Sequence, residues 1–195
     1  NRNNSVAFYD SAYIDGVITV FMILFGINFN MYFLLLLKNV KSVFKNEEVR
    51  AYLGIIAATT IIITFNIMHI YETPLKSFRY AVFQVASIIT TTGFATADYN
   101  LWPELSKCLL LMVMIVGACA GSTGGIKVSR ILILLKSIKQ EVKKTLHPKS
   151  VSVVKLNGKR VSGETMHAVY VYFMAYIFIV IASVLVVSIN NFDFA

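Results

Sequence analysis

Three observations in the sequence predict an all-α integral membrane protein with a re-entrant helix and a glycine-broken transmembrane helix. First, 57% of the 195 residues are hydrophobic, 14% are charged and the mean hydropathy is +0.69. A soluble domain is usually about 45–50% apolar and about 25% charged. Second, the apolar residues gather in four long stretches. Third, a short apolar segment and a cluster of glycines interrupt this pattern.

The four apolar stretches are the predicted spans. Val17–Leu37, Ala51–Ile70 and Ala168–Ile189 are each long enough for the roughly 20 residues that a spanning helix requires. The third stretch, from about residue 105 to residue 135, also passes this length test but contains glycines. Buried helices of soluble proteins are usually shorter, so the membrane interpretation is preferred.

Basic residues are concentrated in two of the loops between these stretches. Thirteen of the 18 lysines and arginines lie in residues 38–50 or 130–160. Because short basic loops stay in the cytoplasm, loops 38–50 and 127–160 are predicted to be cytoplasmic. A basic run can also indicate nucleic acid, but no binding motif or interleaved aromatic pattern accompanies it. No nucleic-acid partner is therefore expected.

The segment between the second and third spans is predicted to enter the membrane and return. Pro74 is expected to end the second helix at the outer surface. The apolar run Ser77–Ile89 follows, with Ser77 as a suitable N-cap. This helix is roughly 20 Å long, too short for a hydrocarbon core of about 30 Å. Since the chain must be outside again before the third span, we predict a pore helix over Ser77–Ile89 and a returning strand over Thr90–Phe94.

The returning strand has the composition of an ion filter. Its residues Thr90, Thr91, Thr92, Gly93 and Phe94 supply carbonyls and hydroxyls without charge. Gly93 permits backbone angles that let neighbouring carbonyls face one way. Rings of carbonyl oxygens replace the hydration shell of potassium in its channels, whereas divalent-ion sites usually add carboxylates. The alternative is an ordinary turn that caps an interfacial helix; the short helix before it and the polar run ATADYN-LWP after it favour the filter.

Several long runs of the sequence resemble one family. FQVASIITTTGFATADYNLWP, GACAGSTGGIKVSRILILLK and LHPKSVSVVKLNGKRV together resemble the Trk/Ktr/HKT superfamily of potassium transporters, and its TrkH type in particular. The first span, with FGINFNMYFLLLLK, is also similar, so the resemblance covers essentially the whole chain. It implies helix–pore-loop–helix repeats, four around one pore, each giving one filter strand centred on a glycine. Here potassium would be held at Thr91, Thr92 and Gly93.

The resemblance also implies how the chain is organised. Residues 1–46 would hold the closing helix of the second repeat and a cytoplasmic link, residues 47–146 the complete third repeat, and residues 147–195 a cytoplasmic loop and the opening helix of the fourth. The first residue is Asn rather than Met, and we expect a piece of a longer chain. One filter strand cannot enclose an ion, so this piece alone is not expected to conduct.

Glycines break the third span. Gly121, Gly124 and Gly125 lie within five residues, and each costs a helix interior about 1 kcal/mol relative to alanine. Two half-helices joined by a loop are therefore predicted. Family members have a similar intramembrane loop that obstructs the pore and acts as a gate, although they carry three consecutive glycines before Ile-Lys where this chain has two. The predicted gating residues are Gly117, Gly121, Ser122, Thr123, Gly124, Gly125 and Lys127.

Other interpretations of this loop stay open. Gly117 and Gly121 form a GxxxG pattern, which lets helices approach closely. Lys127 can extend its amine to the cytoplasmic surface as readily as take part in gating. The run Gly-Gly-Ile-Lys does not fit the GxxxxGK[ST] phosphate loop, so nucleotide binding here is not expected.

The remaining polar residues suggest no catalytic site. Asn28 and Asn30 in the first span are interpreted as partners in buried interhelical hydrogen bonds rather than as ion contacts. Cys108 and Cys119 are interpreted as free thiols, and the three histidines are too scattered for a metal site. No paired carboxylates and no Ser/His/Asp or Cys/His constellation are visible. We expect no enzymatic activity and no cofactor.

The predicted function is potassium uptake across a prokaryotic plasma (inner) membrane, with potassium as substrate and sodium as a second candidate cation. The resemblance implies a multi-pass homodimer surrounded by lipid, with a cytoplasmic nucleotide-binding regulatory subunit at the basic loops. The alternative is a secondary ion-coupled carrier with broken helices. Such a carrier would show an inverted repeat and charged or polar substrate ligands, and neither is visible in the sequence.

Overall fold

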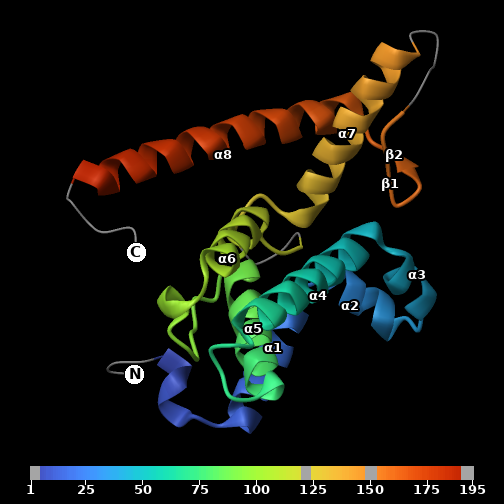
Figure 1. Cartoon of the computed structure of the whole chain (residues 1–195). Coiled ribbons are helices and arrows are strands. Elements are labelled where there is room, and N and C mark those ends of the chain that lie inside the picture. Colours follow the sequence, from blue (N-terminus) through green and yellow to red (C-terminus); the bar gives the residue numbers. More distant parts are fainter. Residues whose placement is uncertain (1–4, 120–123, 148–152, 190–195) are drawn as a thin grey trace. The chain divides into compact units, whose positions relative to one another are not determined.

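Helices account for nearly all the regular structure of the chain, as predicted for an all-α protein (Figure 1). The computed structural model describes residues 5–119, 124–147 and 153–189. The elements are η1 (Ser5–Tyr9), α1 (Ala12–Phe25), α2 (Phe29–Leu36), α3 (Val40–Lys45), α4 (Glu47–Ile67), α5 (Pro74–Ile89), η2 (Tyr99–Leu101), α6 (Glu104–Val116), α7 (Val128–Leu146), β1 (Lys155–Leu156), β2 (Lys159–Arg160) and α8 (Gly163–Ile189).

The chain divides into two compact units, Asn1–Val128 and Ser129–Ala195. The first unit contains α5 and the segments around it, including every described residue that was predicted to bind or gate an ion. The predicted repeat boundaries at residues 46 and 146 stay predictions.

Among the described residues, two helices are long and apolar enough to cross a membrane, α4 and α8. The predicted span Val17–Leu37 is not one continuous helix: α1 and α2 meet at an angle of 92°, as in a broken span or a re-entrant loop. The break begins at Gly26, the C-cap of α1, and ends at Asn28, whose side chain accepts a hydrogen bond from Asn30 N–H at 3.0 Å. Asn28 therefore caps α2. This bond of Asn28 is local rather than interhelical, and because Asn30 is exposed within this chain, its interhelical bond stays a prediction.

A tyrosine from α4 packs directly against this break. Tyr52 is fully buried, and its hydroxyl donates to the Ile23 carbonyl at 3.1 Å. A β-carbon on Gly26 would lie 2.1 Å from the Tyr52 hydroxyl oxygen and 3.0 Å from Thr90 Cγ2. Glycine is needed at residue 26 because other atoms occupy the space of a side chain.

Gly26→Ala is expected to destabilise the folded protein by about 1–3 kcal/mol, as overpacking of a close-packed site usually does. Gly54→Ala on α4 is the matched control, because a β-carbon there would meet no atom within 4 Å. The control gains helix propensity and should melt at the same temperature or higher. Thermal unfolding of the full-length protein in detergent measures both changes, and equal melting temperatures would contradict the packing at Gly26.

The helix predicted over Ser77–Ile89 is present as α5, but it begins three residues earlier than expected; its role as a pore helix stays a prediction. Pro74 opens α5 rather than closing the preceding helix, and the Thr73 side chain accepts from Lys76 N–H. Proline is favoured in the first turn of a helix because its missing N–H has no partner to lose there. The 16 residues of α5 give a length of about 24 Å, still short of a membrane core.

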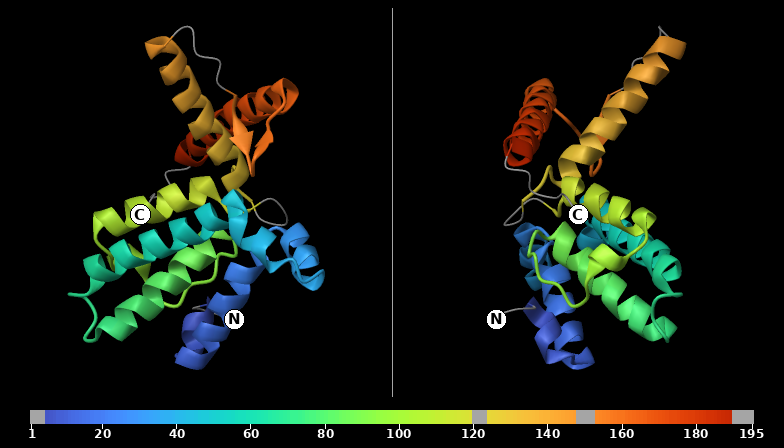
Figure 2. Two further views of the ribbon diagram at one scale, coloured as in Figure 1. Left: turned by 90° about the vertical axis from the view of Figure 1, so that its right-hand side faces the viewer. Right: turned by 60° about the vertical axis from the view of Figure 1, so that its left-hand side comes forward.

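The first unit packs around α5. α4, α5 and α6 lie side by side, and α1 contacts α5 as well (Figure 2). Five apolar side chains of α5 are fully buried: Ala81, Phe83, Val85, Ala86 and Ile89. Trp102 is buried too, and its indole N–H donates to the Tyr71 hydroxyl at 3.0 Å. α5 is therefore the central helix of this unit, although it is too short to span.

The second unit combines a basic helix, a hairpin and a long apolar helix. The turn of the hairpin is Asn157-Gly158, and both residues have positive φ, 51° and 77°, as two-residue hairpin turns require. Lys136 Nζ on α7 donates to the Lys155 carbonyl at 2.8 Å. The Arg130 guanidinium lies 3.9 Å from the centre of the Tyr172 ring on α8.

Candidate functional site

The predicted filter residues directly follow the C-terminal end of α5. The helix ends at Ile89, and Thr90 is its C-cap. Thr90 is buried, whereas residues 91–94 are exposed within this chain and belong to no helix or strand. Residues 90–94 are called the filter segment below. The segment leaves the helix as irregular backbone, and its return through the membrane stays a prediction.

The peptide N–H groups of the filter segment point back at α5. The N–H groups of residues 91, 92 and 93 donate to this helix, the first to the Ile88 carbonyl at 3.1 Å and the other two to the Ser87 carbonyl at 2.9 and 3.5 Å. In a trans peptide, the C=O points opposite to the N–H, and the described chain has no cis peptide. The carbonyls of residues 90–92 belong to these three peptides and therefore point away from α5.

Two residues of the filter segment have left-handed backbone angles. φ is 55° at Thr91 and 78° at Gly93. Glycine adopts such angles freely, but threonine rarely does, so contacts around Thr91 must hold it in this conformation. A β-carbon at Gly93 would meet no atom within 4 Å. Glycine is favoured at residue 93 by its backbone angle and not by lack of space.

The threonine hydroxyls at the inner end of the segment form hydrogen bonds. Thr90 Oγ1 donates to the Ala86 carbonyl at 2.6 Å and lies 2.8 Å from Thr92 Oγ1. Thr91 Oγ1 accepts a hydrogen bond from Gly124 N–H at 3.0 Å. The side chains thus fix the start of the segment to α5 and to the glycine-rich residues.

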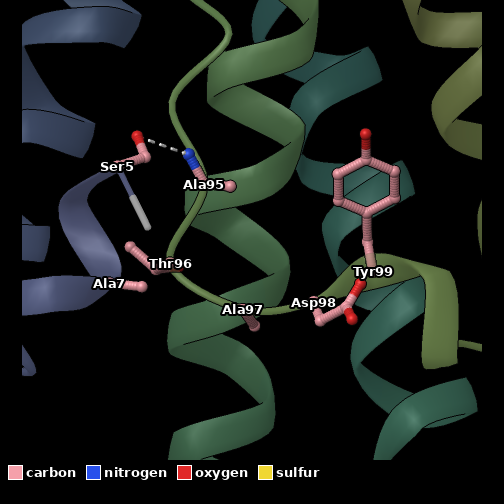
Figure 3. A pocket seen from close by; sticks show the side chains of 7 residues that line it. All are labelled: Ser5, Ala7, Ala95, Thr96, Ala97, Asp98 and Tyr99. Carbon is pink, nitrogen blue, oxygen red and sulfur yellow. Dashed lines mark hydrogen bonds between the residues drawn. The ribbon is translucent and has the colours of Figure 1, made fainter. Parts of the chain in front are cut away.

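The outer end of the segment is held differently. Ser87 Oγ donates to the Phe94 carbonyl at 2.6 Å, so this carbonyl points toward α5. Ala95 N–H donates to Ser5 Oγ at 3.2 Å (Figure 3), and the Ala95 carbonyl accepts from Ala7 N–H at 3.2 Å. The role of Phe94 as an ion ligand stays a prediction, and its carbonyl faces opposite to those of residues 90–92.

The glycine break of the third stretch is present. α6 ends at Val116 and α7 begins at Val128, and the described residues between them, 117–119 and 124–127, are not helical. Residues 117–127 are called the glycine loop below. Of its predicted gating residues, Gly121, Ser122 and Thr123 lie outside the described residues.

Two glycines let the two sides of this loop touch. φ is 70° at Gly117 and 79° at Gly125. A β-carbon on Gly125 would lie 2.8 Å from Gly117 Cα, and one on Gly117 would lie 2.6 Å from the Gly124 carbonyl oxygen. Both the backbone angles and the close approach therefore require glycine.

Backbone hydrogen bonds join the returning side of the loop to α6 and its end. They run from Ile126 N–H to the Ile115 carbonyl (3.2 Å), from Lys127 N–H to Val116 (3.0 Å) and from Val128 N–H to Ala118 (3.1 Å). Lys127 has a φ of 82° and is half-buried. Its two predicted roles, in gating and in reaching the cytoplasmic surface, both stay predictions.

Three interruptions of helical structure meet at the base of the filter segment. Gly124 of the glycine loop contacts Thr91 through the hydrogen bond described above. Cys119 N–H of the same loop donates to the carbonyl of Gly26, the break between α1 and α2, at 3.1 Å. Gly26 in turn lies against Thr90. Non-helical backbone at membrane depth is tolerated where it is buried in protein or lines a wet cavity.

Four side chains that position α5 or the filter segment were missed by the sequence analysis: Ser5, Asp15, Arg79 and Ser87. Arg79 Nε on α5 lies 2.7 Å from Asp15 Oδ2 on α1. An ionisable residue within an apolar stretch is a signal that it has a partner, and Asp15 and Arg79 could have been matched in this way. Nothing in the sequence distinguishes Ser5 or Ser87 from other serines.

The chemistry available at this site is that of uncharged oxygen atoms. Residues 90–94 carry no ionisable side chain. Within the described ranges, no group of three or more His, Cys, Asp or Glu residues could hold a metal ion. Carbonyls that point together from a segment without charge can replace the water around a monovalent cation.

Known proteins similar to this chain are cation transporters. Residues 2–195 match the TrkH family, described as cation transport protein. The chain is 35% identical to the Trk system potassium uptake protein TrkH of Salmonella typhimurium over 97% of its length, and 31% identical to TrkG of Escherichia coli K12 over 99%. It spans 40% of the length of each of these relatives.

A solved structure has the same fold. The crystal structure of the potassium transporter TrkH from Vibrio parahaemolyticus matches with a TM-score of 0.89 and 30% sequence identity. The match covers 98% of this chain and 42% of that one.

Proposed function

The chain belongs to the TrkH family of cation transport proteins, and we propose that it is the central part of a potassium uptake protein. The filter segment forms one wall of the selectivity filter, and the glycine loop is the gate beneath it. One wall cannot surround an ion, so transport is a property of the longer protein.

The direction of the carbonyls is the observation on which this proposal rests. The N–H groups of residues 91–93 are all used by α5, so the carbonyls of residues 90–92 face the opposite side. A row of carbonyls on one side is what a dehydrated cation needs. An ordinary helix C-cap makes similar N–H bonds to the last helical turn; the lack of charge in residues 90–94 and the exposure of residues 91–94 favour the filter over such a cap.

The absence of charge in residues 90–94 favours a monovalent over a divalent cation, since divalent sites usually include carboxylates. Potassium is more easily dehydrated than sodium, and the relatives are named potassium uptake proteins. We propose Thr91, Thr92 and Gly93 as the residues that hold potassium. Selection against sodium is part of the proposal.

The glycine loop is proposed as the gate because it contacts the filter segment from below. Gly124 N–H donates to Thr91 Oγ1, the hydroxyl at the inner end of the proposed ion path. A loop with two required glycines can move its backbone without strain from side chains.

The assembly is proposed from the family. The protein lies in the plasma (inner) membrane as a homodimer, and a cytoplasmic nucleotide-binding regulatory subunit contacts the basic loops. Loop 38–50 presents exposed lysines on and beside α3, at residues 38, 41 and 45. The relatives are transporters by name, and no enzymatic activity is proposed.

Rubidium uptake by the full-length protein, in cells that lack other potassium systems, tests the proposal. Gly93→Ser should reduce the selection of rubidium over sodium by about tenfold, because a side chain at φ 78° costs about 1–2 kcal/mol of strain. The segment can relieve this strain only by turning its peptides.

Gly158→Ser is the matched control for this change. Gly158 has a φ of 77° and, like Gly93, open space at the position of a β-carbon, but it lies in the hairpin of the second unit. Gly158→Ser should therefore leave the selection of rubidium over sodium unchanged. If the unaltered protein, Gly93→Ser and Gly158→Ser all select rubidium over sodium equally, residues 90–94 are not the filter. A strict dependence of uptake on a sodium or proton gradient would favour the secondary carrier.

A further inference from the structure

The peptide group between Phe94 and Ala95 is held on both sides by serine hydroxyls. Ser87, fully buried on α5, donates to the Phe94 carbonyl at 2.6 Å. The Ala95 N–H of the same peptide donates to Ser5 Oγ on η1 at 3.2 Å (Figure 3). Since the C=O and N–H of one trans peptide point in opposite directions, this peptide cannot rotate without breaking one of the two bonds.

The short helix η1 that carries Ser5 is anchored to the rest of the first unit. Val6 is buried in a cluster with Met22 of α1 and with Phe83 of α5. Ser5 itself has a φ of 50°, an angle that non-glycine residues keep only where surrounding contacts impose it. A second bond, from Ala7 N–H to the Ala95 carbonyl, adds to the first.

The two serine hydrogen bonds to the Phe94–Ala95 peptide set the end of the row of carbonyls that point away from α5. The carbonyls of residues 90–92 point away from α5, whereas the Phe94 carbonyl points toward it. The reversal occurs over Gly93 and Phe94, and glycine has the freer backbone of the two. The orientation of the Phe94–Ala95 peptide therefore limits the angles that Gly93 can adopt.

We propose that Ser5 is a selectivity-determining positioning residue, which fixes the outer end of the filter segment from a part of the chain 90 residues earlier. The inference rests on the filter role proposed for residues 90–94. Ser5 touches no ion in this proposal; it acts through the Ala95 peptide. Loss of its hydroxyl frees the outer peptide to turn, and the size of the ion site is then less strictly defined.

A cavity beside the contact makes this change measurable. A space of about 480 Å³ lies between η1 and residues 95–99 (Figure 3). Water that enters it can replace the Ser5 hydroxyl as a partner for Ala95 N–H, so removing the hydroxyl should not simply unfold the segment. It should instead make this amide exchange faster with solvent.

The test compares Ser5→Ala with Ser11→Ala in the full-length protein. Ser11 is the N-cap of α1 but makes no side-chain capping bond, so it controls for a lost serine in the same region. Ser5→Ala should speed hydrogen exchange at Ala95 about fivefold, the loss of one hydrogen bond, and should lower the rubidium-to-sodium uptake ratio. Ser11→Ala should change neither quantity.

A double-mutant cycle adds a readout that a purely structural role would not give. Ser5 and Ser87 hold the same peptide, so the effects of Ser5→Ala and Ser87→Ala on the uptake ratio should be smaller together than their sum. Unchanged exchange at Ala95 in Ser5→Ala would overturn the contact, and faster exchange with an unchanged ratio would overturn its role in selectivity. Absent rubidium uptake by the unaltered protein would sink the proposed function itself, and this inference with it.

Discussion

Arg79→Gln is expected to remove most of the folded protein from the membrane, because it leaves a buried carboxylate without its cation. Asp15 on α1 is 2% exposed, and its Oδ2 lies 2.7 Å from Arg79 Nε on α5. Asp10 reaches the same guanidinium at 3.2 Å. Removing one partner of a buried pair costs about 3–5 kcal/mol, a large share of the roughly 5–15 kcal/mol that holds a protein folded.

The control for this substitution lies one turn away on the same helix. Lys76 pairs with Glu72 at 3.5 Å, but both side chains are largely exposed, and such pairs contribute about 0–1 kcal/mol. Lys76→Gln should therefore leave the yield of monodisperse protein and its melting temperature nearly unchanged. Equal melting temperatures for Arg79→Gln and Lys76→Gln would show that the buried pair does not hold α1 to α5.

A double substitution distinguishes two causes of destabilisation: the loss of the arginine side chain and the burial of an unpaired carboxylate. Asp15→Asn together with Arg79→Gln removes both charges and leaves two amides that can bond to each other. If the cost of Arg79→Gln comes from an uncompensated carboxylate, the double variant should be more stable than the single one. A further loss of stability in the double variant would assign the effect to packing of the arginine side chain.

Those features that depend on local composition were predictable from the sequence. The short helix before Thr90 and the glycine break between α6 and α7 both follow from length and from helix propensity, and the structure contains both. The need for glycine at residue 93 was also predictable, because an irregular turn at membrane depth requires unusual backbone angles. Thr91 adopts a similar angle without any signal in its residue type.

Features that depend on contacts between distant segments were not predictable. The first stretch is mostly apolar around Gly26, with Asn28 and Asn30 as its nearest polar residues, and a single glycine is tolerated in a helix. Glycine becomes necessary at this residue because Tyr52, from α4, fills the space beside it. The start of α5 was missed for a different reason: proline both ends one helix and begins another, and the sequence alone favoured the first use.

If the glycine loop is the gate proposed above, Gly124→Ala should raise the resting cation flux of the full-length protein about fivefold. A β-carbon on Gly124 would lie 3.2 Å from Thr91 Cγ2, closer than carbon atoms normally pack. We expect the glycine loop to move away from the filter segment to relieve this contact, and to lose the bond from Gly124 N–H to Thr91 Oγ1. One such bond contributes about 1 kcal/mol, so its loss shifts a closed-to-open ratio by about fivefold.

Alanine at residue 124 is not expected to strain the backbone. φ is positive at Gly117 and Gly125 but not at Gly124, so alanine is unstrained there and only the contact with Thr91 is altered. Gly125→Ala is the contrasting case: its β-carbon would lie 2.8 Å from Gly117 Cα at a φ of 79°. That change should lower the amount of folded protein instead of raising the flux of each molecule.

Thr91→Ser provides the background in which the Gly124→Ala effect should disappear. Serine keeps the hydroxyl that accepts from Gly124 N–H and lacks the methyl group that the new β-carbon would meet. Relative to Thr91→Ser alone, adding Gly124→Ala should therefore change rubidium flux much less than it does beside Thr91. The same increase in both backgrounds would mean that alanine acts by stiffening the loop, and that this contact does not hold the gate closed.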